Sequence, residues 1–101
     1  REVIKQEIQY TKSNLRLGQQ MHRKYKAGLA DYEKIFKEYR LPSGKKIDFV
    51  DGVTGIIYEL KPNNPRSIKL GLKQLDIYEQ EILADPLFRH ITKWKKTLET
   101  Y

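Results

Sequence analysis

The sequence predicts an α/β (α+β) domain, in which an N-terminal helix precedes a three- to four-stranded mixed sheet with helices packed on it. Three observations support this fold class. Apolar residues recur at alternating spacings of four and three through the first 29 positions, which is the pattern of one helical face. Two segments rich in β-branched and aromatic residues, 46–50 and 56–61, flank a Gly-containing turn. Asn64-Pro65 then starts a second long helix, because Asn caps helices well and Pro suits the first helical position.

The first helix is expected to follow one apolar stripe and to end or bend near Gly28. The stripe comprises Ile4, Ile8, Thr11, Leu15, Gly18, His22, Tyr25 and Leu29. Residues 31–39 are expected to continue as a short second helix that turns Tyr32, Ile35, Phe36 and Tyr39 inward. A strand at 37–41 competes with this helix, and it would complete an antiparallel meander with the two strands that follow.

The remaining elements alternate between strand and helix signals. Turns at 41–44 and 51–55 bound the strand at 46–50, and Pro62 ends the strand at 56–61. The helix after Asn64 is expected to reach about Ala84. Its predicted buried stripe is Ile68, Leu72, Leu75, Tyr78 and Ile82. Asp85-Pro86 indicates a short helix or loop, and alternation over 94–101 indicates a final strand.

Length and composition favour one domain, residues 1–101, whose hydrophobic core carries the whole fold. The 101 residues include no Cys, which excludes zinc ribbons, Fe–S clusters and thiolate nucleophiles. No apolar run approaches the roughly 20 residues that span a bilayer, and no signal-peptide core is present. Because the chain begins at Arg1, it is expected to be a C-terminal fragment of a longer polypeptide.

The net charge of +7 is concentrated in the first half of the chain. Residues 1–47 hold 12 Lys and Arg against 5 Asp and Glu, whereas residues 48–101 hold 8 of each. A largely cationic stripe flanks the apolar face of the first helix, and the helix after Asn64 has its cations in the first half. That order opposes the helix dipole but suits a bound phosphate. The predicted nucleic-acid-binding residues are Lys12, Arg16, Arg23, Lys26, Arg66, Lys69 and Lys73.

Two carboxylates and a lysine form the strongest candidate for a catalytic site. Glu59 and Lys61 share one face of their strand, because side chains alternate with a period of two. Asp48 lies on the preceding strand of a predicted hairpin, so it is expected to converge with Glu59 at one end of the sheet. Two carboxylates offer hard oxygen ligands to Mg²⁺ or Mn²⁺. Lys61 beside that ion would orient or deprotonate a water, or neutralise charge on a phosphorane, as phosphodiester hydrolysis requires.

Three segments, 41–49, 57–66 and 71–78, resemble the PD-(D/E)xK restriction-endonuclease-like superfamily. They read Leu-Pro-Ser-Gly-Lys-Lys-Ile-Asp-Phe, Ile-Tyr-Glu-Leu-Lys-Pro-Asn-Asn-Pro-Arg and Gly-Leu-Lys-Gln-Leu-x-x-Tyr. More narrowly, they are similar to the nuclease toxin domains at the C-termini of bacterial polymorphic and contact-dependent inhibition toxins. The resemblance covers about residues 18–101 and implies a small restriction-endonuclease-like fold, although the usual Pro before Asp48 is missing.

The resemblance also implies roles for individual residues and for partners. The implied catalytic residues are Asp48, Glu59, Lys61 and Gln74. The two acids would be metal ligands, and the lysine would be the catalytic lysine. An additional acid from an earlier element would be Glu38 or Glu33, between which the spacing does not choose. The protein would be a secreted or cell-surface toxin delivered to the cytoplasm of a target bacterium, and a cognate immunity protein would be its partner.

Several functions remain open from the sequence. A metal-dependent endonuclease toxin acting on DNA is slightly favoured over one that cuts tRNA or other RNA. A non-catalytic basic nucleic-acid-binding module and a pseudo-enzyme that binds a protein partner are alternatives of other classes. The Glu59–Lys61 pair would then be a solvated ion pair at a strand end. His22, on the apolar stripe, is expected to be a packed or hydrogen-bonded structural histidine.

Overall fold

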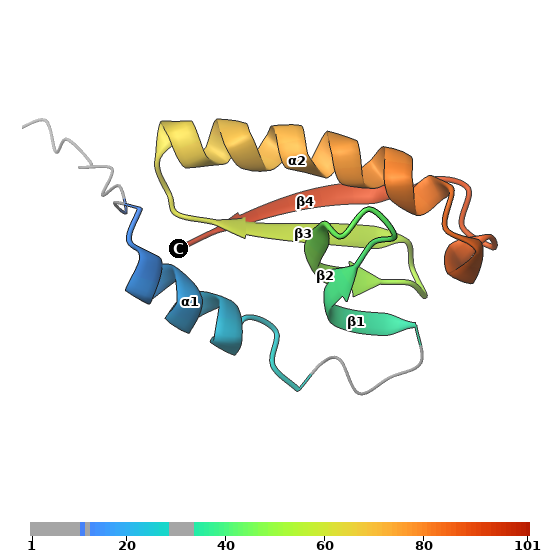
Figure 1. Cartoon of the computed structure of the whole chain (residues 1–101), viewed down its shortest axis with the longest axis horizontal. Helices are drawn as coiled ribbons and strands as arrows, with labels where there is room; N and C mark the ends of the chain where they lie inside the picture. The colour runs from blue at the N-terminus through green and yellow to red at the C-terminus, as the bar shows by residue number, and fades with distance from the viewer. Residues whose placement is uncertain (1–10, 12, 29–33) are drawn as a thin grey trace, which may run out of the picture.

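The fold is a four-stranded mixed sheet with one helix on each side, seen in a computed structural model that describes residues 11, 13–28 and 34–101 (Figure 1). The elements in chain order are α1 (Leu15–Lys24), β1 (Ile35–Arg40), β2 (Lys46–Asp51), β3 (Ile56–Lys61), α2 (Pro65–Leu83), the 3₁₀ helix η1 (Pro86–Phe88) and β4 (Lys95–Thr100). The sheet order is β1-β2-β3-β4. Strands β1, β2 and β3 form an antiparallel meander, and β4 pairs parallel to β3 after the α2 crossover. The predicted α+β fold is confirmed.

Helix α2 begins where the sequence places it. The Asn64 side chain accepts a hydrogen bond of 2.8 Å from the Ser67 N–H, and Pro65 occupies the first turn. The helix packs on β3 and β4 and covers the main core. The core comprises Leu41, Ile47, Val50, Ile57, Leu75, Tyr78, Ile82, Phe88 and Trp94. None of the described helices is long and apolar enough to span a membrane.

The buried face of α2 differs from the predicted stripe in its first half. Leu72 is 52% exposed, and the buried positions there are Ser67 and Gly71. The reason is close packing, because a Cβ on Gly71 would lie 2.6 Å from Leu98 Cδ1 and 2.8 Å from Lys61 Cγ. Small residues therefore occupy the positions where the helix comes nearest to β3 and β4, and the larger Leu72 faces solvent.

The helix predicted over residues 31–39 is wrong for the part that the structure describes, where β1 forms instead. The competing prediction, a strand that completes an antiparallel meander, is confirmed, although β1 begins and ends slightly earlier than predicted. Phe36 and Tyr39 both pack against the core, with ring centroids 5.1 Å apart. A regular strand would turn residues three apart to opposite faces. Glu38 lies between them with φ 54°, in the left-handed region, and this residue shifts the phase of the strand. The shift produces a spacing that resembles helical periodicity.

Helix α1 is shorter than its apolar pattern predicted, and positions such as Ile4 and Ile8 lie outside the described residues. It contributes no buried residue and is attached largely by polar contacts. Lys37 Nζ donates to the carbonyls of His22, Arg23 and Tyr25 at 2.5, 2.7 and 2.7 Å. These are the free carbonyls of a helix end, so Lys37 terminates α1 and fixes it to β1.

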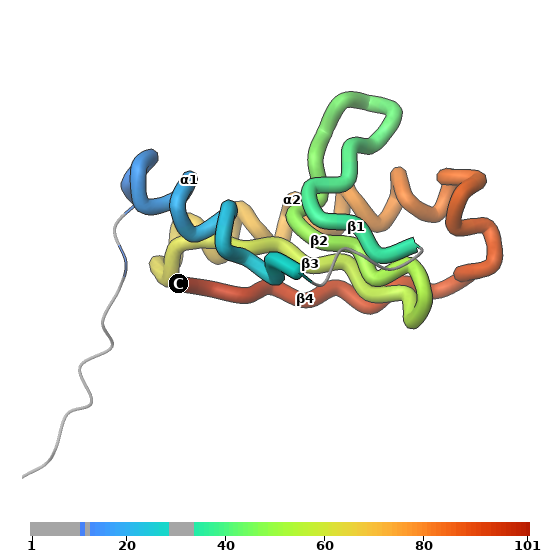
Figure 2. Tube along the Cα trace, turned by 90° about the horizontal axis from the view of Figure 1, so that it is seen from below, coloured from blue at the N-terminus to red at the C-terminus, as the bar shows by residue number. Residues whose placement is uncertain are grey.

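The sheet opens at one end. Pairing between β2 and β3 runs from Asp51↔Ile56 to Phe49↔Tyr58 and stops there. Figure 2 shows the β1–β2 turn projecting away from β3, whereas α1 lies beside the C-terminal part of β3. The space between α1 and the β1–β2 hairpin therefore lies above the second half of β3.

Candidate active site

A cleft of about 590 Å³ occupies this opening of the sheet. It draws residues from α1, from the β1–β2 hairpin, from β3 and from α2. The lining residues are Leu15, Gly18, Gln19, His22, Arg23, Glu38, Lys46, Asp48, Glu59, Lys61, Gln74 and Tyr78. All four predicted catalytic residues thus share one cleft, together with Glu38 and Arg23 from the other predicted sets.

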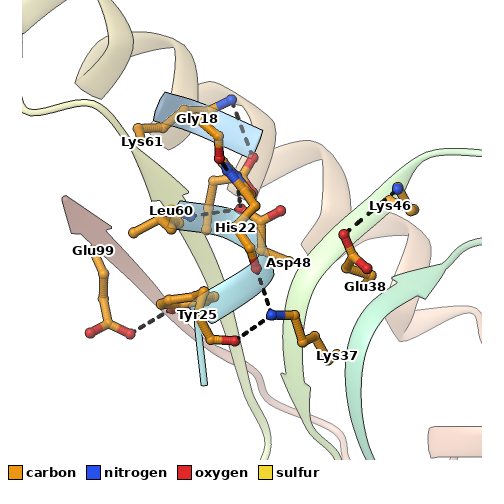
Figure 3. A network of polar contacts seen from close by, with 11 residues as sticks. Gly18, His22, Tyr25, Lys37, Glu38, Lys46, Asp48, Leu60, Lys61 and Glu99 are labelled. Carbon is orange, nitrogen blue, oxygen red and sulfur yellow. Dashed lines mark hydrogen bonds and ion pairs between the residues drawn. The ribbon is translucent and has the colours of Figure 1, made fainter. Parts of the chain in front are cut away.

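Strand register places Asp48 and Glu59 on one face of the sheet. Continuing the ladder one residue beyond the Phe49↔Tyr58 pair sets Asp48 opposite Glu59, on the face that α2 covers. Regular pairing is replaced there by a side-chain contact, in which the Leu60 N–H donates to Asp48 Oδ2 at 2.7 Å. The carboxylate of Asp48 therefore takes the position of a ladder acceptor and is oriented by the backbone of β3 (Figure 3).

Glu59 is a buried acid, with only 2% of its surface exposed. Burial raises the pKa of Glu59 to about 9, and a hydrogen bond to Asp48 together with the charge of Asp48 adds to the shift. Lys61 Nζ, 3.7 Å from Glu59 Oε2, opposes the shift without cancelling it. Asp48 and Glu59 therefore line one cleft in which ionisation of both carboxyl groups is unfavourable, unless a cation lies between them.

Lys61 reaches the site along a notch in α2. Its side chain is 19% exposed and passes over Gly71, where the missing Cβ leaves room for the Lys61 methylenes. A helical Gly is unfavourable by roughly 1 kcal/mol relative to Ala, so the space it creates has a structural use. The notch directs the ammonium group toward Glu59.

Two further groups on α2 face the same cleft. Gln74 Oε1 is buried and has no hydrogen-bond partner among the described residues. Tyr78 lines the cleft, and burial raises the pKa of its phenol, with the charges of Glu59 and Asp48 adding to the effect. The phenol therefore stays protonated, whereas the Gln74 carbonyl oxygen is an acceptor without a donor in the described part of the chain.

The structure treats the two candidates for an additional acid differently. Glu38 lines the cleft, is half exposed and lies 3.9 Å from Lys46 Nζ. Its left-handed backbone sits opposite Asp48 in the strand register, at the position where β1–β2 pairing is interrupted. Backbone strain of this kind concentrates at functional sites. Glu33 lies outside the described residues.

His22 is a cleft residue that the sequence reading treated as structural. Its Nδ1 is hydrogen-bonded to the Gly18 carbonyl at 2.8 Å, as a structural histidine would be, but its Nε2 lies 3.3 Å from Asp48 Oδ2 (Figure 3). One feature of the sequence could have indicated this position: His22 lies on the same helical stripe as Leu15 and Gly18, which also line the cleft. The face of α1 that looked like core faces the site instead.

The predicted nucleic-acid-binding residues do not form one surface. Arg16 is exposed, Arg23 lines the cleft and Lys12 lies outside the described residues. Lys26 is engaged elsewhere, with Nζ 3.2 Å from Glu99 Oε1 and 4.3 Å from the centroid of the Tyr58 ring. The exposed cations of the first half of α2 are Arg66, Lys69 and Lys73. None of these three forms an ion pair with another residue in the described part of the chain.

The acidic second half of α2 has a structural explanation. Lys96 Nζ pairs with Asp76 and Glu79 at 2.8 and 3.0 Å, and Lys45 Nζ lies 3.6 Å from Glu81 Oε2. These acids therefore hold β4 and the β1–β2 turn against the helix. The unpaired cations of the first half lack such a role, so the charge order of α2 points to a partner only at its N-terminal half.

The donor set of the cleft suits a divalent cation, although the ligands are not fully gathered. Across residues 11, 13–28 and 34–101, no group of three or more His, Asp and Glu side chains is arranged to hold a metal ion. The chemistry nevertheless fits, because Asp48 and Glu59 line the same cleft and Gln74 Oε1 is a buried oxygen without a donor in the described part of the chain. A cation would remove both the repulsion and the unsatisfied acceptor.

A helix, an antiparallel meander, a crossover helix and a parallel fourth strand, with Asp48 and Glu59-x-Lys61 at the centre, define a restriction-endonuclease-like domain. Comparison with protein families gives the particular member of this class. Residues 10–101 match the family described as restriction endonuclease fold toxin 9, and the chain belongs to that family. Comparisons with curated proteins and with solved structures gave no match.

Proposed function

We propose that this domain is a metal-dependent endonuclease that hydrolyses phosphodiester bonds in nucleic acid, with DNA favoured over RNA. The observation that carries the proposal is the cleft that Asp48 and Glu59 share, opposite each other in the continued β2–β3 register, with Lys61 Nζ 3.7 Å from Glu59 Oε2. As a structural feature this arrangement is costly, because burial and mutual repulsion both act against the charged forms. Membership in a family of toxins with a restriction endonuclease fold supports the same conclusion.

Asp48 and Glu59 would hold the metal ion, Mg²⁺ or Mn²⁺, and Gln74 Oε1 would accept a hydrogen bond from a water of the site. A divalent ion bound there supplies Lewis-acid polarisation of a phosphoryl oxygen. Asp48 is already oriented for this role by the Leu60 N–H. Burial of Glu59 beneath α2 excludes bulk water, which strengthens each electrostatic contact within the cleft.

Lys61 would act directly on the reacting groups. Its Nζ lies 3.7 Å from Glu59 Oε2, and its side chain is more exposed than that of Glu59. From this position it would orient the attacking water and donate hydrogen bonds to the phosphoryl oxygens as charge accumulates on them. The Gly71 notch fixes the direction of the side chain, so the ammonium group needs little reorganisation during the reaction.

Cations around the cleft would position the polyanion. Arg23 lies on the α1 wall, and Arg66, Lys69 and Lys73 project from the first half of α2. Such contacts supply affinity without sequence information, as suits a toxin that must cut many targets. A cognate immunity protein would neutralise the domain and would be acidic where it covers these cations. The domain would act as a bacterial effector delivered to the cytoplasm of a target cell.

A cleavage assay with point variants tests the proposal. Plasmid DNA and total tRNA are incubated with wild type, Asp48→Asn, Lys61→Met and the control Lys93→Met, each with Mg²⁺, with Mn²⁺ and with EDTA. Wild type and the control should cut in the presence of metal, and the two site variants should lose at least 100-fold in rate. Cutting of tRNA alone would assign the substrate to RNA. Binding of nucleic acid without metal-dependent cleavage would support a basic binding module and end the nuclease proposal.

A further inference from the structure

The ring of His22 is oriented by a backbone carbonyl. Nδ1 lies 2.8 Å from the Gly18 oxygen, and a carbonyl oxygen can only accept a hydrogen bond. Nδ1 therefore carries the proton of this contact, and Nε2 is the ring atom that faces Asp48 in the cleft. In the neutral ring this arrangement leaves the lone pair of Nε2 directed at the site.

The distance from His22 Nε2 to Asp48 Oδ2 is 3.3 Å, which is long for a hydrogen bond between these groups. A charge-assisted N–H···O contact is usually about 2.7–2.9 Å. Two donors that are each about 2.1 Å from one cation, at an angle of about 90–105°, stand about 3.0–3.3 Å apart. The spacing fits two ligands of a shared ion as well as it fits an ion pair between a protonated ring and the carboxylate.

The surroundings of both groups follow the pattern of metal ligands. A ligating histidine usually donates its other ring N–H to a backbone carbonyl or a carboxylate, as His22 donates to Gly18. Asp48 is likewise fixed by the Leu60 N–H at 2.7 Å. Lys37 donates a hydrogen bond to the backbone carbonyl of His22 itself (Figure 3). This contact fixes the backbone that carries the imidazole and thereby its position at the cleft.

We propose that His22 Nε2 is a ligand of the divalent cation held by Asp48, and that this nitrogen makes the site prefer Mn²⁺ or Co²⁺ to Mg²⁺. The inference rests on the proposed function, because it assumes the metal site at Asp48 and Glu59. His22 and Asp48 already lie at ligand spacing, whereas Glu59 would have to be drawn toward the ion to add a second carboxylate, since no three such side chains are gathered in the described residues. Imidazole suits first-row transition metals, whereas Mg²⁺ favours oxygen ligands, so one nitrogen donor shifts the order of affinities.

Isothermal titration of MgCl₂, MnCl₂ and CoCl₂ into the purified domain tests this inference. Four proteins are compared: wild type, His22→Gln, Asp48→Asn and the matched control His90→Gln. His90 also binds a carbonyl, that of Gly52, but does not line the cleft. Wild type and the control should bind Mn²⁺ and Co²⁺ at least tenfold more tightly than Mg²⁺. His22→Gln should lose at least tenfold in affinity for Mn²⁺ and Co²⁺, and less than threefold for Mg²⁺.

A second measurement uses the unaltered protein. The chain has two His, so the imidazole nitrogens give a simple long-range ¹H–¹⁵N spectrum. Addition of Zn²⁺, a diamagnetic probe, should shift the His22 Nε2 resonance and leave His90 unmoved. An unmoved His22 resonance at saturating Zn²⁺ would overturn the inference even if a variant failed to fold.

The outcomes separate this inference from the proposed function. If Asp48→Asn abolishes binding of all three ions while His22→Gln changes them equally or not at all, the metal site stands and His22 is not a ligand. Tighter Mg²⁺ binding by His22→Gln would mean that a protonated ring competes with the cation, which also overturns the inference. If Asp48→Asn leaves binding unchanged, the metal site of the proposed function fails.

Discussion

Replacement of Glu59 by Gln should make the metal-free domain more stable at neutral and alkaline pH. The pKa of Glu59 is raised from its ordinary value to about 9, chiefly by burial and then by Asp48. Between the unfolded and folded pKa values, the native state holds a proton that the unfolded chain has lost. Stability therefore falls as pH rises through this range, by up to about 1.4 kcal/mol per pH unit. Gln keeps the shape and hydrogen-bonding capacity of the protonated acid but does not titrate.

The magnitude is large enough to measure by thermal unfolding. For a chain of this length, 1 kcal/mol corresponds to about 4–8 °C in Tm, so the wild type should lose up to about 6–11 °C per pH unit. Melting curves recorded every half unit from pH 5 to 8 suit this purpose, because the lowered pKa values of Glu99 and Asp51 affect stability only at more acidic pH. Subtracting the Glu59→Gln curve removes the groups that both proteins share.

The control and the metal arm distinguish this explanation from a structural ion pair. Glu79→Gln alters an acid that pairs with Lys96 at the surface and should keep the wild-type slope. Added Mg²⁺ or Mn²⁺ should raise the wild-type Tm most at the upper end of the range, and should hardly affect Glu59→Gln. If Glu59→Gln is less stable than wild type at every pH and the two curves run parallel, Glu59 is an ionised partner of Lys61 and the reasoning is refuted.

Three further substitutions probe other parts of the molecule. Changing Arg66, Lys69 and Lys73 together to Ala should flatten the salt dependence of duplex binding, by about 0.9 in log–log slope for each lost phosphate contact, as measured by fluorescence anisotropy. An unchanged slope would mean that these cations only face solvent. Gly71→Ala should lower both Tm and cleavage, since its Cβ would overlap the lysine of β3, and a rise in Tm with full activity would contradict the notch. Lys37→Met should speed amide hydrogen exchange throughout α1 and leave β3 protected, because three carbonyls lose a charged donor. Unaltered exchange in α1 would show that other contacts hold the helix.

Local signals account for the parts of the fold that sequence reasoning predicted. The strands β2 and β3 are bounded by turns, and the start of α2 is determined by the Asn64 side chain and by Pro65, all within a few residues. The shared face of Asp48 and Glu59 follows from the same local information, because one hairpin with a period of two brings both side chains to it. The chemistry of the candidate site could therefore be predicted without long-range contacts.

Features that depend on distant contacts were not predictable. A helix and a strand both remained open for the β1 segment, because Phe36 and Tyr39 share a face, and only the left-handed Glu38 explains how a strand achieves this. His22 looked like a core residue because an amphipathic pattern indicates that one face of the helix is covered. The pattern does not identify the surface that covers it. Here the covering surface is a polar cleft, and the position of α1 over it depends on Lys37, from another element.

The parallel pairing of β3 with β4 has a consequence for when the site exists. Glu59 lies opposite Leu98 in that ladder, and Leu98 also closes on Gly71 beneath Lys61. Strand β2, on one side of β3, is close to it in the sequence. Strand β4, on the other side, pairs with β3 only after the whole of α2 has crossed the sheet, and contacts between residues so far apart in sequence form slowly. A chain held unfolded therefore contains every residue of the candidate site without the arrangement that gathers them into one cleft. The cleft is complete only once α2 has crossed the sheet and β4 has paired with β3.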